Sequence, residues 1–222
     1  MINLHLIYPE IALGTLALGL MLADLFVAAK HGRFLYHLAW IASIVTLCLV
    51  GFSISDGAHG QGIGTLWAVD PMSQFFKMLV LLTTALCLLL GLEYKNIPAE
   101  HAGTFVSLLL MCSAGMMFLV SAIDLVLIFI SLELISLSSF ILTGFERGNP
   151  RSNEGSVKYF LFGAFSSAIM VYGISLFYGA TGTTKLVGLA SGGPMMILGV
   201  LMILLGFAFK ASIAPMHFWV QE

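Results

Sequence analysis

The chain has 222 residues, of which 59% are hydrophobic and 9% are charged, and its formal net charge is -2. Soluble domains carry roughly 25% charged residues, so this composition excludes a protein whose whole surface faces water. The small net charge also argues against a basic surface that binds nucleic acid. The composition therefore indicates an integral membrane protein.

Apolar runs long enough to cross a bilayer, which takes about 20 residues in a helix, follow one another along the chain. In chain order they cover residues 7–28, 36–54, 71–92, 104–121, 123–145, 157–180 and 194–214. These runs lack the alternating polarity of barrel strands, and an open sheet would leave backbone groups unpaired in lipid. We therefore predict seven transmembrane helices, whose longest connections are residues 55–70 and 146–156.

Lysine and arginine residues gather in alternate connections between the predicted helices. The first connection holds Lys30 and Arg33, the third holds Lys95, and the fifth holds Arg147 and Arg151, with Lys158 just beyond it. The connections on the other side carry Lys185 alone. Because positively charged loops stay in the cytoplasm, the sequence predicts an N-terminus outside the cell and odd-numbered loops inside it.

One carboxyl group lies deep inside the fifth predicted helix. Glu133 is eleven residues into that run, which is about 16 Å along a helix and close to the middle of the bilayer. The serines around it make this the most polar part of any predicted helix: Ser131, Ser136, Ser138 and Ser139. A hydrogen-bonded glutamic acid that only packs helices together is the alternative interpretation. Since an ionisable group is costly at this depth, we favour a functional role.

A lysine lies in the seventh predicted helix. A count from Pro194 places Lys210 about 24 Å along that helix, on the cytoplasmic side, where a lysine side chain also extends readily to the interface. Pro215 is predicted to break the helix just after this lysine. Apolar residues resume at Met216, which favours a break within the membrane, where broken helices line cavities and ion sites. We therefore interpret Lys210 as a second functional residue.

Four further ionisable residues lie near the ends of predicted helices. Lys158, Lys77 and Asp124 are interpreted, on the residues alone, as groups at the membrane interface, where charge is common. His217 follows the predicted break in the seventh helix. A histidine there either bonds a backbone carbonyl or, since imidazole titrates near neutral pH, serves a proton relay; the residues leave both open.

The three cysteines offer no metal site. Cys48, Cys87 and Cys112 lie inside apolar runs without the spacing of metal ligands, so we interpret them as small buried hydrophobic side chains. No cysteine cluster or glycine-rich phosphate-binding loop occurs in the sequence. We therefore expect no metal, redox centre or nucleotide in this chain.

Three stretches of the chain form specific motifs. They are LVSAIDL at 119–125 with LEL at 132–134, KYFLFGAFSS at 158–167 with YGATG at 178–182, and FK at 209–210 with PMHFW at 215–219. They resemble the fifth, sixth and broken seventh helices of the N subunits of proton-pumping NADH-quinone oxidoreductase, the respiratory complex I. The stretch 158–182 is the most specific, and favours the N subunits over the related L and M subunits and Mrp-type antiporter subunits.

The resemblance implies an all-α polytopic membrane protein, the first part of a fourteen-helix antiporter-like fold with inverted five-helix repeats. Residues 1–103 match the three N-terminal transmembrane helices, and residues 104–222 match an incomplete first repeat that ends at the break in the seventh helix. The residues at 220–222, VQE, differ from the usual Thr-Pro-Asp of the family. We expect the chain to be an N-terminal fragment that does not pump protons alone.

In the family, electrons pass from NADH through FMN and iron–sulfur clusters to quinone in other subunits, and the membrane subunits supply proton paths. The resemblance implies that Glu133 and Lys210 belong to such a path, in which a charged glutamate stabilises the ammonium and its removal lets the lysine release a proton. Lys158 and His217 match the lysine of the sixth helix and the histidine after the break. We therefore expect a translocase subunit of the cell inner membrane, with other membrane-arm subunits as partners.

Three other functions fit part of the pattern. A Mrp-type cation/proton antiporter subunit has the same plan of charges. A non-transporting scaffold subunit fits the helices but gives no reason to keep both Glu133 and Lys210 in the bilayer. A seven-helix retinal protein also has a lysine in its seventh helix, but we expect an acidic residue one turn before that lysine, where this chain has Gly206.

Overall fold

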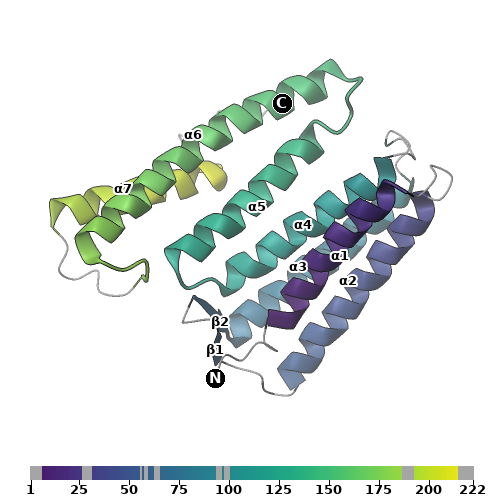
Figure 1. Ribbon diagram of the computed structural model, residues 1–222, viewed down its shortest axis with the longest axis horizontal. Helices are drawn as coiled ribbons and strands as arrows, with labels where there is room; N and C mark the ends of the chain where they lie inside the picture. The colour runs from purple at the N-terminus through teal and green to yellow at the C-terminus, as the bar shows by residue number, and fades with distance from the viewer. Residues whose placement is uncertain are drawn as a thin grey trace. The chain divides into compact units, whose positions relative to one another are not determined.

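Seven α-helices and one short hairpin make up the computed structural model, which describes residues 7–26, 32–55, 57, 60–62, 66–93, 97, 101–186 and 193–214. The helices are α1 (Tyr8–Asp24), α2 (Gly32–Ser55), α3 (Pro71–Glu93), α4 (Ala102–Ser121), α5 (Leu125–Thr143), α6 (Pro150–Thr181) and α7 (Pro194–Lys210). The hairpin pairs β1 (Gly60–Gly62) with β2 (Trp67–Val69) in antiparallel register. The elements form two compact units, Met1–Ala122 and Ile123–Glu222 (Figure 1).

Each predicted apolar run overlaps one of these helices. Within the described part of the chain, α2 to α6 are long and apolar enough to cross a membrane. The other two, α1 and α7, have 17 residues each, which is the lower end of the range for a spanning helix. The structure thus confirms the predicted all-α, multi-pass membrane fold.

Two local features differ from the sequence prediction. Helix α6 begins at Pro150, seven residues before the predicted start at 157, because the Asn149 side chain caps it by accepting a hydrogen bond from Arg151 N. A proline at the first helical position is also compatible with a helix start. The predicted loop at 55–70 contains the hairpin, whose Gly60 pairs with Val69.

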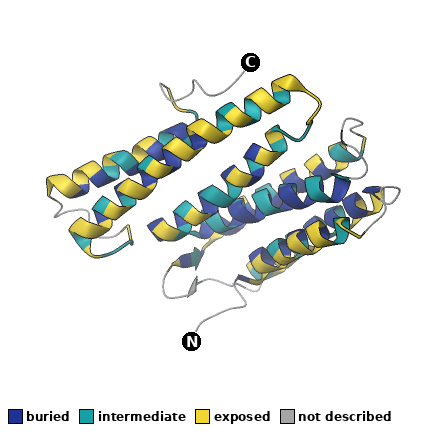
Figure 2. Ribbon diagram, turned by 45° about the horizontal axis from the view of Figure 1, so that its top comes forward, coloured by how far each residue is buried: buried dark blue, intermediate teal, exposed yellow. Residues whose placement is uncertain are grey.

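Unit Met1–Ala122 is a bundle in which α4 packs against α1, α2 and α3. Buried residues line the helix faces that meet their neighbours, and exposed apolar residues cover the outer faces (Figure 2). Leu13, Leu81 and Leu110 are among the most buried side chains of this core. Large exposed apolar side chains are unfavourable in water and suit a surface that faces lipid.

The two ends of this bundle are fastened by aspartates. At one end, Asp24 of α1 accepts hydrogen bonds from the backbone amides of Gly103 and Thr104, at 3.1 and 2.8 Å. These amides lie in the first turn of α4 and have no partner within their own helix. At the other end, Asp70 accepts from Ser73 N at 2.7 Å, and Ser73 Oγ accepts from Asp70 N at 3.0 Å. This reciprocal arrangement caps the start of α3.

In unit Ile123–Glu222, α6 packs against both α5 and α7. Two glycines allow the close approach of α6 and α7: a Cβ on Gly173 would lie 2.8 Å from Gly199 O and 2.9 Å from Ile203 N. On the α5 side, a Cβ on Gly163 would lie 2.3 Å from the ring of Phe140. Gly163 and Gly173 therefore mark helix contacts, as small residues do in membrane bundles.

We predict that Gly173→Ala destabilises the protein, because the added methyl meets backbone atoms of α7 that do not yield. Overpacking of this kind costs about 1–3 kcal/mol. The midpoint of thermal unfolding of the full-length protein in detergent measures the loss. Gly51→Ala is the matched control, since a Cβ at Gly51 in α2 would meet nothing within 4 Å. Equal midpoints for both variants would contradict the packing described for α6 and α7.

A pH prediction follows from the cap of α3. The hydrogen bond from Ser73 N lowers the pKa of Asp70 below its usual value. The stability that Asp70 contributes is therefore present at neutral pH and is lost as the pH falls through this lowered pKa. We expect Asp70→Ala to cost about 1 kcal/mol at neutral pH, as helix N-caps do.

Asp70→Asn is the matched variant, because asparagine keeps the acceptor oxygen and removes the titration. Its stability at neutral pH should equal that of the wild type, while its acid-dependent loss should be smaller. Urea unfolding of the full-length protein at several pH values provides the comparison, and an identical pH dependence in Asp70→Asn would refute the role of this carboxylate.

Candidate functional site

Helix α5 carries the site, and its start is fixed by Asp124. The Asp124 side chain is buried, accepts a hydrogen bond from Val126 N at 2.9 Å and accepts another from Thr184 Oγ1 at 2.5 Å. Leu125 N donates to Thr184 O at 3.0 Å. The segment after α6 is therefore bonded to the first turn of α5, and Asp124 is a helix cap.

The other end of α5 is held by the start of α6. Ser156 Oγ donates to Phe140 O at 2.8 Å, and Ser152 Oγ donates to Thr143 O at 2.6 Å. The last four carbonyl groups of a helix have no donor within that helix, and the two serine hydroxyls donate to two of them here. Both ends of α5 are thus fixed against α6, which sets the position of the residues in the middle of α5.

Glu133 is the ninth residue of the 19 in α5 and so lies at its middle. The serines around it bond mainly to their own helix: Ser131, Ser136, Ser138 and Ser139 each donate to the carbonyl four residues earlier. Each of these hydroxyl groups therefore donates its hydrogen bond within α5 and needs no acceptor from a neighbouring helix. The oxygen of Ser136 remains available as an acceptor.

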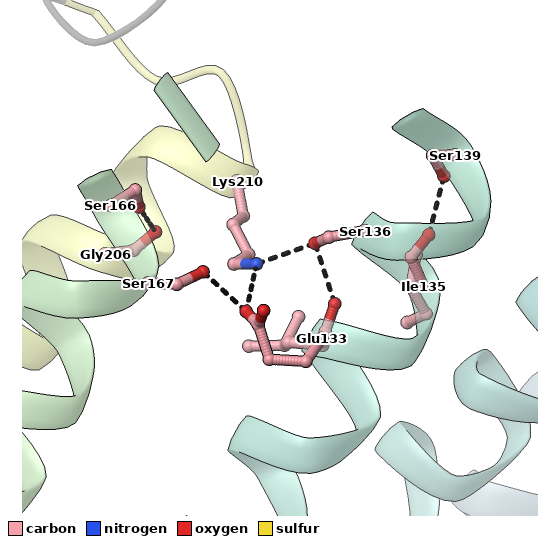
Figure 3. A network of polar contacts seen from close by, with 9 residues as sticks. Glu133, Ile135, Ser136, Ser139, Ser166, Ser167, Gly206 and Lys210 are labelled. Atoms are coloured by element: carbon pink, nitrogen blue, oxygen red, sulfur yellow. Dashed lines mark hydrogen bonds and ion pairs between the residues drawn. The ribbon is translucent and has the colours of Figure 1, made fainter. Parts of the chain in front are cut away.

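Three helices bring polar groups together around the Glu133 carboxylate (Figure 3). From α7, Lys210 Nζ lies 3.0 Å from Glu133 Oε1 and donates to Ser136 Oγ at 2.6 Å. From α6, Ser167 Oγ donates to the same Glu133 Oε1 at 2.5 Å. One carboxylate oxygen therefore receives both an ammonium and a hydroxyl. This set of Glu133, Ser136, Ser167 and Lys210 is named the Glu133–Lys210 network below.

The network is largely shielded from water. The side chains of Lys210 and Glu133 are 11% and 27% exposed. At 3.0 Å and an effective dielectric of about 20, the attraction between the two charges is roughly 5.5 kcal/mol. Much of this attraction offsets the cost of desolvating both groups, so the ion pair depends on the additional hydrogen bonds from Ser167 and to Ser136.

Helix α7 ends at Lys210, so this lysine occupies the last turn of the helix. Ser212 has a φ of 53°, in the left-handed region, and Ile213 N donates to Ala208 O at 2.9 Å. This backbone arrangement closes a helix, and it rarely occurs without glycine. The ammonium of Lys210 therefore reaches the middle of α5 from the end of a short helix. Pro215, predicted to cause the break, lies outside the described residues.

The structure does not bring all predicted residues into the network. Lys158 pairs with Glu154 one turn earlier in α6, and both side chains are exposed, at 45% and 61%. It lies nine residues before Ser167, or about 13 Å along the helix axis. His217 lies outside the described residues. The free side chains of Cys48 and Cys87 are exposed, where a buried position was predicted; they lie on outer helix faces, where lipid is the apolar surrounding.

Sequence reasoning missed two polar residues. Ser167 was predicted only as part of the motif at 158–167, and its position opposite the middle of α5 shows that it bonds Glu133. Glu10 was not predicted as a site residue. Its partner, Lys77, was assigned to the interface, yet the two side chains form a buried ion pair. The available signal was an acid in the first predicted apolar run and a lysine in the third.

Proteins of known family are similar to this chain in sequence. A family model described as NADH:quinone oxidoreductase/Mrp antiporter, TM, matches residues 122–222. "NADH-quinone oxidoreductase subunit N" of Trichlorobacter lovleyi is 36% identical over 100% of this chain and 47% of its own length. "F(420)H(2) dehydrogenase subunit N" of Methanosarcina mazei is 33% identical over 96% of this chain and 46% of its own.

A solved structure shares the fold. A chain of respiratory complex I from Thermus thermophilus, solved with bound Aureothin, superposes with a TM-score of 0.79 at 30% identity, over 95% of this chain and 45% of that one. The chain is therefore similar to membrane subunits of NADH:quinone oxidoreductases and Mrp antiporters. The relatives named here are N subunits, and the chain spans about half of their length.

The geometry of the network predicts strong coupling between its two charges. Glu133→Gln and Lys210→Met should each destabilise the full-length protein, and the double variant should lose less than the sum, with a coupling energy of about 1–3 kcal/mol. Thermal or denaturant unfolding in detergent gives the stabilities of the wild type, the two single variants and the double variant, which together form a double-mutant cycle. Glu154→Gln with Lys158→Met is the control cycle on an exposed pair, where we expect coupling within experimental error. Additive losses at Glu133 and Lys210 would rule out the ion pair.

Proposed function

We propose that this chain supplies part of a proton path in the N subunit of a proton-translocating NADH-quinone oxidoreductase. The ion pair between Glu133 of α5 and Lys210 of α7 is the observation that carries the proposal. A carboxylate, an ammonium and two hydroxyls at hydrogen-bond distance are groups that hold and exchange protons. NADH, FMN, iron–sulfur clusters and quinone would be bound by other subunits of the complex, which are the proposed partners.

The ion pair would act as a switch of proton affinity. While Glu133 is a carboxylate at 3.0 Å, it stabilises the Lys210 ammonium. When Glu133 takes up a proton or moves away, the ammonium loses that attraction and keeps the desolvation cost, so one proton leaves Nζ and the neutral amine remains. The attraction of roughly 5.5 kcal/mol exceeds the cost of about 3.5 kcal/mol for moving one proton against ~150 mV.

Lys158 and His217 are proposed as further residues of the path. Lys158 is placed on the exposed side of α6, paired with Glu154, and would exchange protons with water or with a neighbouring subunit. His217 follows α7 in the sequence, and its imidazole would relay a proton beyond the end of that helix. Both assignments come from the family motifs that these residues match.

The proposed orientation has the N-terminus outside and the chain in the cell inner membrane. Arg33 lies at the start of α2, Arg147 lies between α5 and α6, and Arg151 lies in the first turn of α6. Successive helices cross in opposite directions, so these arginines belong to one side of the membrane, and the positive side is cytoplasmic. The domain division at 103/104 follows the family repeat and remains a prediction.

A Mrp-type cation/proton antiporter subunit is the second candidate, because the matching family model includes Mrp antiporters. The relatives from Trichlorobacter lovleyi and Methanosarcina mazei are named as N subunits, one of an NADH-quinone oxidoreductase and one of an F(420)H(2) dehydrogenase, which favours the first candidate. Their names give different electron donors, and the proposed membrane role is common to both.

The test uses the full-length protein in its parent complex. We predict that Glu133→Ala and Lys210→Ala lower proton translocation per NADH oxidised through this subunit at least about tenfold, since a loss of only 1.4 kcal/mol gives a factor of ten. Inside-out membrane vesicles with a pH-sensitive dye report the translocation. Glu93→Gln, at an exposed acid of α3, is the control. An assembled Glu133→Ala complex with unchanged pumping would refute the proposal.

A further inference from the structure

A second buried ion pair lies in unit Met1–Ala122. Lys77 Nζ of α3 lies 2.5 Å from Glu10 Oε1 of α1, and the two side chains are 3% and 0% exposed. Glu10 is in the first turn of α1, and Lys77 is in the second turn of α3. The proposed path through Glu133 and Lys210 makes no use of these two residues.

The surroundings leave one carboxylate oxygen free. Among the described residues, Glu10 Oε2 has no hydrogen-bond partner, and neither has the buried Nε1 of Trp67 or the buried Oγ of Ser121. The ammonium, in contrast, has other stabilising neighbours besides Glu10. Lys77 Nζ lies 5.2 Å from the centre of the Trp67 ring, as in a cation–π contact, and the charge of Asp70 also acts on it.

A Glu10–Lys77 pair that stayed ionised and served only to stabilise the fold would not explain the carboxylate oxygen without a partner. Two charges buried away from water stabilise a fold only when hydrogen bonds satisfy their remaining atoms, and an apolar pair would pack α1 against α3 without that cost. The free Oε2 of Glu10 leaves this requirement unmet. A proton on that oxygen would remove the buried negative charge, while Trp67 and Asp70 would continue to stabilise the ammonium.

We propose that Glu10 and Lys77 form a second proton-binding site of this chain, separate from the Glu133–Lys210 network. One proton from the aqueous phase binds Glu10 Oε2 and converts the carboxylate to a carboxylic acid. Lys77 keeps its three protons, so the charge of the pair changes from zero to +1. Release of that proton restores the ion pair, and no bond other than O–H forms or breaks.

The position of the pair determines which side supplies the proton. Ser53, near the end of α2, lies 3.4 Å from Gln74 of α3, so α2 ends where α3 begins. Asp24 bonds the first turn of α4, and Tyr36 meets Gly91, at the opposite end of the bundle. The remaining charged and histidine side chains described on these four helices or at their ends lie at that opposite end: Asp24, Arg33, His37, Glu93 and His101. Tyr8, two residues before Glu10, and Asp70 are the other titratable groups near the pair, and Cys48 lies in the half of α2 that runs toward it.

In the proposed orientation the pair therefore faces the outside. The site exchanges its proton with the outer aqueous phase, beneath the hairpin of β1 and β2 that carries Trp67. The existence of the site follows from the contacts within this unit and does not depend on the pumping role of Glu133.

Infrared difference spectroscopy tests this site directly. The full-length protein, reconstituted in lipid vesicles, is perfused with buffers of stepped pH while the C=O absorption of protonated carboxylic acids is recorded. We expect a band that grows as the pH falls and is lost in Glu10→Gln. Lys77→Met should move the midpoint of that band about 1–3 pH units higher, because an opposite charge favours the carboxylate by this amount. Lys77→Arg should leave the midpoint near that of the wild type.

Two controls separate this site from other carboxyl groups. Glu93→Gln should leave the Glu10 band intact, and the band should persist in a Glu133→Gln background. If the Glu10 band persists in Glu133→Gln while proton pumping is lost, the Glu10–Lys77 site and the Glu133–Lys210 path are supported independently. If the wild-type and Glu10→Gln spectra are the same at every pH at which the protein stays folded, Glu10 does not bind a proton and the proposal is overturned. A midpoint unchanged in Lys77→Met would also overturn it, and Lys77→Arg keeps the comparison available if Lys77→Met does not fold.

Discussion

A charge that is held inside an apolar helix bundle needs a partner, and this requirement organises unit Ile123–Glu222. Glu133 in the middle of α5 has its partner in Lys210 at the end of α7. The short length of α7 and the turn at Ser212 place the ammonium level with the middle of α5. Ser167 of α6, the helix that packs on both, completes the contact.

The same requirement explains the supporting structure. The start of α5 is bonded through Asp124 to the segment after α6, and the end of α5 is bonded to α6 through Ser156. Helix α6 in turn approaches α7 at Gly173. These contacts hold three helices at fixed distances, so small changes at the carboxylate act on the ammonium without rearranging the bundle. Unit Met1–Ala122 repeats the principle with Glu10 and Lys77, in a different set of helices.

Much of this was predictable from the sequence, for a physical reason. Hydrocarbon requires long apolar runs, which located the seven helices of the described residues, and it makes charges costly, which singled out Glu133 and Lys210. Contacts between helices were not predictable, because hydropathy does not record which faces meet. The contacts of Ser167 with Glu133 and of Glu10 with Lys77 were therefore not predicted. The early start of α6 depends on Asn149, a cap that lies outside any apolar run.

The central claim is that Glu133 and Lys210 form an ion pair that opens during turnover. Solid-state NMR of the full-length protein in its parent complex measures this through the dipolar coupling between the Glu133 carboxyl carbon and the Lys210 Nζ nitrogen. The account predicts a strong coupling in the resting complex, in keeping with the 3.0 Å contact, and a weaker average coupling while NADH is oxidised. No coupling at rest, or the same coupling in both states, would contradict it.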